Sequence, residues 1–217
     1  MADLIHLTID GRSVASSPDT RILWAALDNG IYIPNLCAIR EANPAIASCR
    51  LCLVEVDGRP DLVAACAEPV AKKMVVHTTT RRIIRVRRTA FELLMSNHPV
   101  VCATCPKNGP CGLQDIARRL GFKLKQNRFH ELPRAYAVDE SHPAVRYDAN
   151  LCILCGKCVY VCNTRGAGAL NFALRGMDTV VATCGGVPLA EAGCSGCGEC
   201  VAICPTGAIT PNVRPSR

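Results

Sequence analysis

A duplicated run of four cysteines constrains this chain more than any other feature. The spacing C-x2-C-x2-C-x3-C occurs at residues 152–162 and again at residues 194–204. In such a run the first three thiolates hold three corners of one [4Fe–4S] cubane, and the fourth binds the other cubane of the pair. Zinc takes only four ligands from two paired spacings, so two complete runs favour cubanes over structural zinc. The repeat therefore predicts two cubanes held close together.

The crossing of the fourth cysteines gives each predicted cubane its ligands. One set is Cys152, Cys155, Cys158 and Cys204, and the other is Cys194, Cys197, Cys200 and Cys162. Pro205 follows Cys204 as the bacterial ferredoxin pattern requires. Asn163 replaces that proline after Cys162, a departure that concerns only the local turn.

A second group of cysteines lies near the N-terminus, at Cys37, Cys49, Cys52 and Cys66. Four thiolates bind either Zn²⁺ or a [2Fe–2S] core. Cys49 and Cys52 precede a predicted strand over residues 51–56, and Cys66 ends a returning strand over residues 62–66. This context resembles the sheet edge of plant-type ferredoxins, although their internal spacing differs, and it favours a [2Fe–2S] cluster.

A third group, called the His98 group below, combines a histidine with three cysteines: His98, Cys102, Cys105 and Cys111. Three thiolates leave one corner of a cubane open, and His98 is placed to fill it. The alternative is that His98 merely ends a helix before Pro99. A neutral histidine ligand makes the site less negative by one charge, which raises the reduction potential by analogy with Rieske centres. One cysteine, Cys184, belongs to no group, and we expect it to be a small buried hydrophobic side chain.

Sixteen cysteines in 217 residues indicate either disulfides or metal sites. The N-terminus shows no basic segment followed by an apolar one, and no apolar run reaches the ~18 residues of a membrane span. We therefore expect a cytoplasmic protein with reduced thiols and no membrane span.

The net charge of +7 suggests nucleic-acid binding. Four clusters would contribute about −7, however, so we expect the loaded protein to be near neutral and to bind no nucleic acid.

Hydrophobic patterning predicts an α+β chain with several segments. Residues 1–78 form the [2Fe–2S] domain, 79–130 a helical segment with the His98 group and its [4Fe–4S] cluster, 131–147 a linker, 148–208 a domain with two cubanes, and 209–217 a loose tail. The segment from residue 71 to 130 is expected to be mainly helical.

Individual elements are predicted from local signals. We expect a strand over residues 4–9 with a turn at Asp10-Gly11, and a helix over residues 21–29 with its N-cap among residues 17–20 and its end at Gly30. Thr80 is expected to cap a helix that runs to Ser96. The apolar face of that helix would carry Ile83, Ile84, Phe91, Leu94 and Met95. Its other face would carry Arg81, Arg82, Arg85, Arg87 and Arg88, either in solvent or against clusters or a partner. A short helix is expected over residues 114–120.

The order of the four groups, with SNHPVVCATCPKNGPCGLQD between the first and the last two, resembles a known family over residues 1–208. It is similar to the large iron–sulfur subunit of respiratory complex I, to the N-terminal region of [FeFe]-hydrogenases and some formate dehydrogenases, and to the small iron–sulfur subunit of NAD(P)-reducing [NiFe]-hydrogenases. The small subunit matches best, because the sequence stops at Arg217 without a catalytic domain. The resemblance implies an N-terminal β-grasp ferredoxin-like domain and a C-terminal domain like bacterial two-cluster ferredoxins.

The resemblance also implies a function and partners. The chain would conduct electrons between a flavin/NAD(P)-binding subunit and hydrogenase or formate dehydrogenase subunits, often with a thioredoxin-like [2Fe–2S] subunit. Some members of the family bifurcate electrons and use ferredoxin. No catalytic residue of its own is readable, because residues 165–169 lack the G-x-G-x-x-G fingerprint of a dinucleotide site. An independent electron carrier and a zinc-dependent scaffold are the alternatives.

Overall fold

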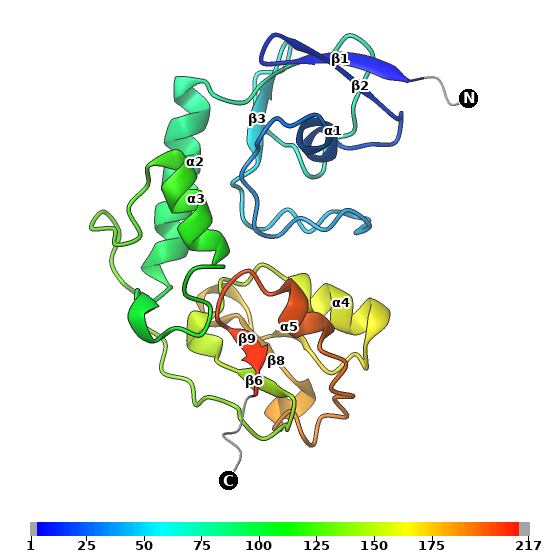
Figure 1. The fold of residues 1–217 in the computed structure, drawn as a ribbon. Coiled ribbons are helices and arrows are strands. Elements are labelled where there is room, and N and C mark those ends of the chain that lie inside the picture. Colours follow the sequence, from blue (N-terminus) through cyan, green and yellow to red (C-terminus); the bar gives the residue numbers. More distant parts are fainter. Residues whose placement is uncertain (1–3, 213–217) are drawn as a thin grey trace. The chain divides into compact units, whose positions relative to one another are not determined.

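The first predicted strand pair folds as a hairpin in the computed structural model, which describes residues 4–212 (Figure 1). Strand β1 (Ile5–Ile9) pairs antiparallel with β2 (Arg12–Ser16). Asp10 and Gly11 both have positive φ, at 48° and 76°. Two such residues make the tight turn that matches the twist of the flanking strands. The predicted turn at Asp10-Gly11 is therefore confirmed.

Five strands form the sheet of the N-terminal region, in the order β2-β1-β5-β3-β4. They include β3 (Leu53–Val56), β4 (Val63–Ala64) and β5 (Val75–His77). Strand β5 runs parallel to β1 and antiparallel to β3. It corrects the expectation of mainly helical structure from residue 71. The β-branched pair Val75 and Val76 suits a slot between two strands, where Val76 is fully buried.

Helix α1 (Ile22–Asp28) follows the hairpin and buries Ile22, Leu23 and Ala26. It ends as predicted, since Gly30 adopts φ +71° and the N–H of Ile31 donates to the carbonyl of Ala26. The predicted N-cap is wrong, because Arg21 occupies the cap position and no side chain bonds the first turn. Packing of the apolar face, rather than a cap, therefore accounts for this short helix.

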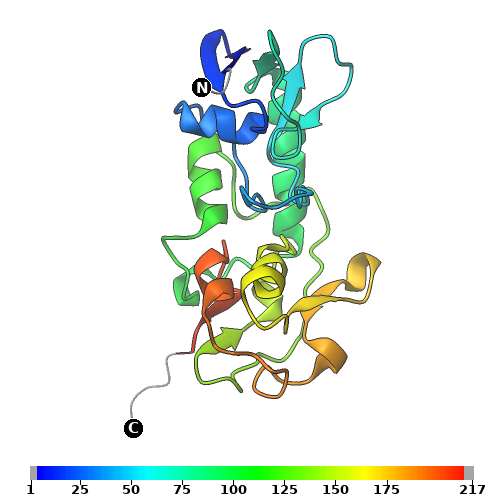
Figure 2. The same ribbon diagram turned by 90° about the vertical axis from the view of Figure 1, so that its right-hand side faces the viewer.

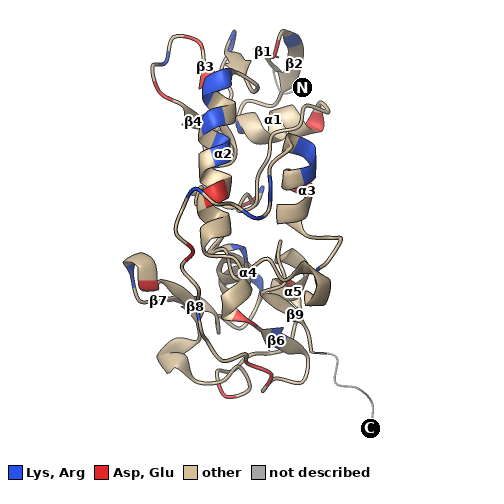
Figure 3. Cartoon of the chain, turned by 90° about the vertical axis from the view of Figure 1, so that its left-hand side faces the viewer, with Lys and Arg blue, Asp and Glu red and all other residues tan. Residues whose placement is uncertain are grey.

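Helix α2 (Arg81–Ser96) begins where predicted, since the Thr80 hydroxyl oxygen accepts a hydrogen bond of 3.2 Å from the N–H of Ile83. Two positions on it differ from the prediction. Ile84 is 44% exposed, whereas Arg87 is only 3% exposed. The i, i+4 spacing places Arg87 between the buried residues Ile83 and Phe91 on one stripe of the helix. The other arginines of the predicted basic face are exposed, and basic residues recur along α2 in Figure 3.

The remainder of the chain is built from short elements. They are the helices α3 (Gly112–Leu120), α4 (Lys157–Arg165) and α5 (Glu199–Ile203), the strands β6 (Val145–Tyr147), β7 (Asn171–Ala173), β8 (Val180–Ala182) and β9 (Ile209–Pro211), and the 3-10 turns η1 (Cys102–Thr104), η2 (Ala149–Leu151), η3 (Gly176–Asp178) and η4 (Cys184–Gly186). Strands β6 and β9 pair antiparallel, as do β7 and β8. Helices α4 and α5 lie side by side (Figures 1 and 2).

Two of these strands lie where irregular structure was expected. Strand β6 falls in the predicted linker, and β9 falls in the predicted loose tail. The two pair with each other, which explains why neither shows a strong signal alone. The rest of the predicted tail, residues 213–217, lies outside the described residues.

The chain divides into two compact units, Met1–Phe91 and Glu92–Arg217, of which residues 4–91 and 92–212 are described. The core of the first unit lies between the five-stranded sheet and α1, and contains Ile9, Ile22 and Val54. The core of the second unit includes five buried cysteines among its apolar residues, Cys152, Cys158, Cys162, Cys200 and Cys204. None of the helices within residues 4–212 has the length and apolar character to cross a bilayer.

Truncation of Ile9 tests the core of the first unit. Ile9 has no exposed surface, so Ile9→Ala should lower the free energy of unfolding by about 2–5 kcal/mol through lost burial and a residual cavity. Ile84→Ala, on the exposed side of α2, should change it by no more than about 0.5 kcal/mol. Urea unfolding of the anaerobic protein, followed by circular dichroism, measures both. Equal effects of the two variants would contradict this placement of the core.

Candidate metal centres

The two C-x2-C-x2-C runs fold into loops with the same backbone geometry. In the first loop Leu154 and Gly156 have φ of +54° and +76°. In the second, Gly196 and Gly198 occupy the equivalent positions with φ of +67° and +75°. Left-handed residues at these two places turn the loop sharply around its three cysteines, and a helix starts directly afterwards, α4 or α5. The repeat seen in the sequence is therefore a repeat in backbone conformation.

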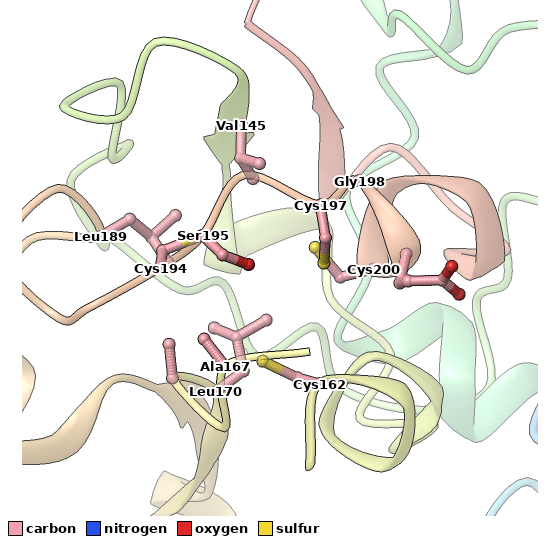
Figure 4. Close-up of a pocket in the computed structure, with 12 residues that line it drawn as sticks. Val145, Cys162, Ala167, Leu170, Leu189, Cys194, Ser195, Cys197, Gly198 and Cys200 are labelled. Carbon is pink, nitrogen blue, oxygen red and sulfur yellow. The ribbon is translucent and has the colours of Figure 1, made fainter. Parts of the chain in front are cut away.

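One hollow is lined by the first three cysteines of the second run together with the fourth cysteine of the first run. Figure 4 shows the thiols of Cys162 and Cys197 facing the same space, with Cys194 and Cys200 beside it. Apolar walls come from two almost fully buried residues, Leu170 and Leu189. The structure thus brings together a complete predicted ligand set from α4, from the loop before α5 and from α5 itself.

A second hollow is lined by the reciprocal set. Cys152 and Cys155 come from the loop before α4, Cys158 comes from the first turn of α4, and Cys204 directly follows α5. Each of these four cysteines is buried. The loop N–H of Leu154 donates a hydrogen bond of 3.4 Å to the sulfur of Cys152. In each of the two hollows, the fourth cysteine of one run therefore lies with the first three cysteines of the other run, as the sequence predicts.

The chemistry of these thiols suits metal binding. Burial raises the pKa of Cys155 to about 12 and the pKa of Cys200 to about 11. Thiolates in such surroundings need compensating positive charge, which metal cations supply as they displace the protons. Within residues 4–212, no three His, Cys, Asp or Glu side chains converge on the position of one bare ion. The thiols instead line the walls of hollows.

A third hollow is lined by all four residues of the His98 group, His98, Cys102, Cys105 and Cys111. Burial lowers the pKa of His98, and a hydrogen bond to the backbone carbonyl of Leu151 opposes that shift. The imidazole is therefore neutral at pH 7 and keeps a lone pair for a metal. Its Nδ1 is buried and has no hydrogen-bond partner among the described residues. A buried nitrogen without a partner is costly, and coordination would satisfy it.

The wall of this third hollow also contains a glycine that sequence reasoning missed. A Cβ on Gly207 would lie 2.7 Å from the sulfur of Cys105 and 3.3 Å from the Leu151 side chain. Such close approach admits only glycine unless the thiol moves. Gly207 and Cys105 are far apart in sequence, so no local pattern could have identified this glycine.

The N-terminal cysteine group also converges. Cys37, Cys49, Cys52 and Cys66 are each no more than 5% exposed. The sulfurs of Cys37 and Cys49 lie 3.4 Å apart. Hydrogen bonds from Cys49 and Cys66 hold the pKa of the Cys37 thiol well below its usual range, and a hydrogen bond from Cys66 also lowers the pKa of Cys52. These contacts show that all four sulfurs gather at one place beside β3 and β4.

Cys184 is placed differently from the prediction. It begins the 3-10 turn η4 and is exposed rather than buried. The correction has a local cause, because Gly185 and Gly186 both adopt positive φ and turn the chain at the surface. Cys184 lines none of the three hollows.

Comparisons with family models cover most of the chain in three segments. Residues 2–81 match a 2Fe-2S iron-sulfur cluster binding domain. Residues 87–124 match the NADH-ubiquinone oxidoreductase-G iron-sulfur binding region, and residues 151–208 match a 4Fe-4S dicluster domain. The order of these segments agrees with the order of the four ligand groups.

Similar whole proteins include subunit HndD of an NADP-reducing hydrogenase from Solidesulfovibrio fructosivorans, 41% identical over 95% of this chain and 36% of its own length. The alpha subunit of an NADPH-Fe(3+) oxidoreductase from Geobacter sulfurreducens is 38% identical over 95% of this chain and 24% of its own. The chain thus spans about a third or less of these curated relatives. A chain in the crystal structure of an NAD⁺-reducing [NiFe]-hydrogenase in the H2-reduced state is 33% identical with a TM-score of 0.85. That match covers 95% of this chain and 87% of the other.

Adding one methyl group to Gly207 tests the third hollow. The new Cβ should push the Cys105 sulfur from its place, so Gly207→Ala should lose the metal held there, about four iron atoms per chain. Iron analysis and EPR of the anaerobically purified variant measure the loss. The signals of the other centres serve as an internal control and should persist. Full iron content with unchanged EPR would show that the hollow is not a metal site.

Proposed function

Because the chain belongs to the same iron–sulfur protein family as the matched chain of the NAD⁺-reducing [NiFe]-hydrogenase, we propose that it conducts electrons inside a multi-subunit NAD(P)-linked redox complex. The observation that carries this proposal is the pairing of hollows with ligand sets. Each of three hollows in the second unit is lined by one complete set of four protein ligands. Matches to 2Fe-2S and 4Fe-4S families support the kind of centre.

The proposed centres are one [2Fe–2S] and three [4Fe–4S] clusters. Their ligands would be Cys37, Cys49, Cys52 and Cys66; His98, Cys102, Cys105 and Cys111; Cys152, Cys155, Cys158 and Cys204; and Cys194, Cys197, Cys200 and Cys162. When bound, each cluster takes up and releases one electron. The chain's own residues place the thiolates, exclude water with apolar walls such as Leu170 and Leu189, and leave room beside Cys105 at Gly207.

Strand topology supports the finer fold assignments. The first unit has a mixed five-stranded sheet with one helix across it, with β1 and β5 parallel at its centre. We assign it to the β-grasp ferredoxins on this order. The second unit pairs two equivalent cysteine loops, each followed by a helix, and closes with the β6–β9 pair. We assign this part to the bacterial two-cluster ferredoxins, preceded by the segment that carries the His98 group.

The proposed partners follow from what the similar proteins have in common. Each of the three is named for a reaction of NAD⁺, NADP⁺ or NADPH, and two of them are hydrogenases. We therefore propose that one neighbour is a flavin-containing subunit that binds NAD(P), and that the other neighbour is a hydrogenase module. Neither the reaction of NAD(P) nor the reaction of the hydrogenase module needs a catalytic group from this chain. The chain provides the electron path between the two partners.

Substitutions of His98 test whether this residue is a cluster ligand or only ends a helix. His98→Cys should keep a cubane and lower its midpoint potential, because a thiolate adds a negative charge to the site. His98→Ala should leave a labile centre that loses iron or converts to a three-iron form. EPR-monitored redox titration measures both changes. If every centre keeps its potential and its iron in both variants, His98 is not a ligand.

Removing one corner ligand tests the electron path. In the assembled complex, Cys155→Ser and Cys197→Ser should lower H₂-dependent NAD(P) reduction by about 10-fold or more, since even changes around metal ligands typically cost about 10- to 100-fold. Dye reduction with NAD(P)H and viologen reduction with H₂ should remain, because each needs only one partner. Cys184→Ser is the matched control and should change none of the three activities. Coupled turnover at full rate in both ligand variants would show that electrons travel elsewhere.

A further inference from the structure

Arg87 is the cation most deeply buried in the described part of the first unit. Its side chain lies between Ile83 and Phe91 on the packed face of α2, and the residue is 3% exposed. Arginine is almost never fully buried without a charged partner, because removing a charge from water is costly. The surroundings of Arg87 therefore need an explanation that a solvated basic helix face does not provide.

The hydrogen bonds of Arg87 involve only neutral groups. One terminal nitrogen donates to the carbonyl of Thr78 at 2.8 Å, and the other donates to the carbonyl of Leu53 at 2.9 Å. The Nε atom is buried and has no hydrogen-bond partner within residues 4–212. The nearby carboxylate of Asp10 is already bound by the backbone N–H and the hydroxyl of Thr78. Two carbonyl oxygens fix the guanidinium in position, and neither of these hydrogen bonds joins it to a carboxylate, although the charge of Asp10 lies near enough to act on it.

The position of Arg87 relates its positive charge to the N-terminal cysteine group. Leu53, to which it bonds, directly follows Cys52 in the chain. Burial lowers the pKa of Arg87 to about 10, and the negative charges that Cys52, Asp10 and Tyr32 carry when ionised oppose that shift. At neutral pH the guanidinium thus remains charged. It bonds to the residue that follows Cys52, one of four buried cysteines that gather at a single place.

We propose that Arg87 is the buried counter-ion of the N-terminal [2Fe–2S] centre and raises its reduction potential. The proposal rests on the assignment of Cys37, Cys49, Cys52 and Cys66 as ligands of that centre. A [2Fe–2S] core with four thiolates carries about −2 when oxidised and about −3 after it accepts one electron. A fixed cation attracts the more negative state more strongly, and burial protects this attraction from screening. Arg87 is a positioning and tuning residue and need not contact a transferred group.

Titration of charge variants tests the proposal. Arg87→Gln removes the charge but keeps hydrogen-bond donors for the two carbonyls. It should make reduction of the [2Fe–2S] centre about tenfold less favourable, which for one electron is a downward shift of about 59 mV. Arg87→Lys keeps the charge and should retain most of the original potential. The measurement is an EPR-monitored titration with dithionite, in which each step adds one electron to the centre and no proton.

Two controls distinguish the effect of the buried Arg87 charge on the potential from the effect of exposed basic residues. Arg85→Gln removes an exposed charge from the same helix and should leave the potential almost unchanged. Raising the salt concentration from about 0.1 M to about 1 M shortens the screening length from about 10 Å to about 3 Å. The difference between Arg87→Gln and the unmodified protein should survive that change, since water and ions do not reach the side chain.

Each outcome of the variants decides the proposal. An unshifted potential in Arg87→Gln, or an equal downward shift in Arg87→Lys, would overturn it. If Arg87→Gln cannot hold the centre while Arg87→Lys can, the charge is required and the proposal stands. Loss of the centre in both variants would show that the guanidinium acts only through its two carbonyl bonds. Absence of any [2Fe–2S] signal in the unmodified protein would instead defeat the ligand assignment, which is a separate failure.

Discussion

Convergence of thiols from distant segments is the constraint on which the second unit depends. Its strands β6 and β9 are only three residues long, and five cysteines belong to its apolar core. The cysteine side chains thus lie among apolar residues such as Leu170, Leu189 and Ile209. Since metal binding that requires the folded state contributes its free energy to folding, the proposed clusters would act as the centre of this core. The reciprocal ligand sets would also link the two cysteine loops, each of which would contribute to both centres.

The balance between the positive charge of the chain and the negative charge of the proposed clusters is the second constraint. The chain carries a net charge of +7, whereas the proposed clusters would contribute about −7. Most of the basic side chains are exposed and exert effects that salt screens. Arg87 differs because it is buried beside a cysteine site, where a charge acts strongly on its neighbours. Under the proposal made for Arg87, one centre has a raised potential even though the chain with its clusters is near neutral.

Local signals predicted those features that depend on neighbouring residues. The Asp10-Gly11 turn, the Thr80 cap and the end of α1 at Gly30 each follow from the conformational preference of one or two residues. The predictions failed where a distant partner decides the outcome. Strand β5 is stabilised by pairing with both β1 and β3, between which it lies. Strands β6 and β9 are stabilised by pairing with each other. Helical periodicity leaves open whether the face that carries Arg87 lies in solvent or against a cluster or partner, and only the structure shows that Arg87 is buried.

The sequence by itself determined the chemistry, because cysteine spacing within a short loop specifies which thiols can reach one cluster. All four predicted ligand groups converge, and three of them line separate hollows. Only the tertiary structure decided what surrounds those ligands. The space that Gly207 leaves for Cys105, the unpartnered nitrogen of His98 and the burial of Arg87 each require contacts between residues far apart in the chain. Spacing therefore predicts which side chains form one ligand set, whereas packing decides what surrounds each set.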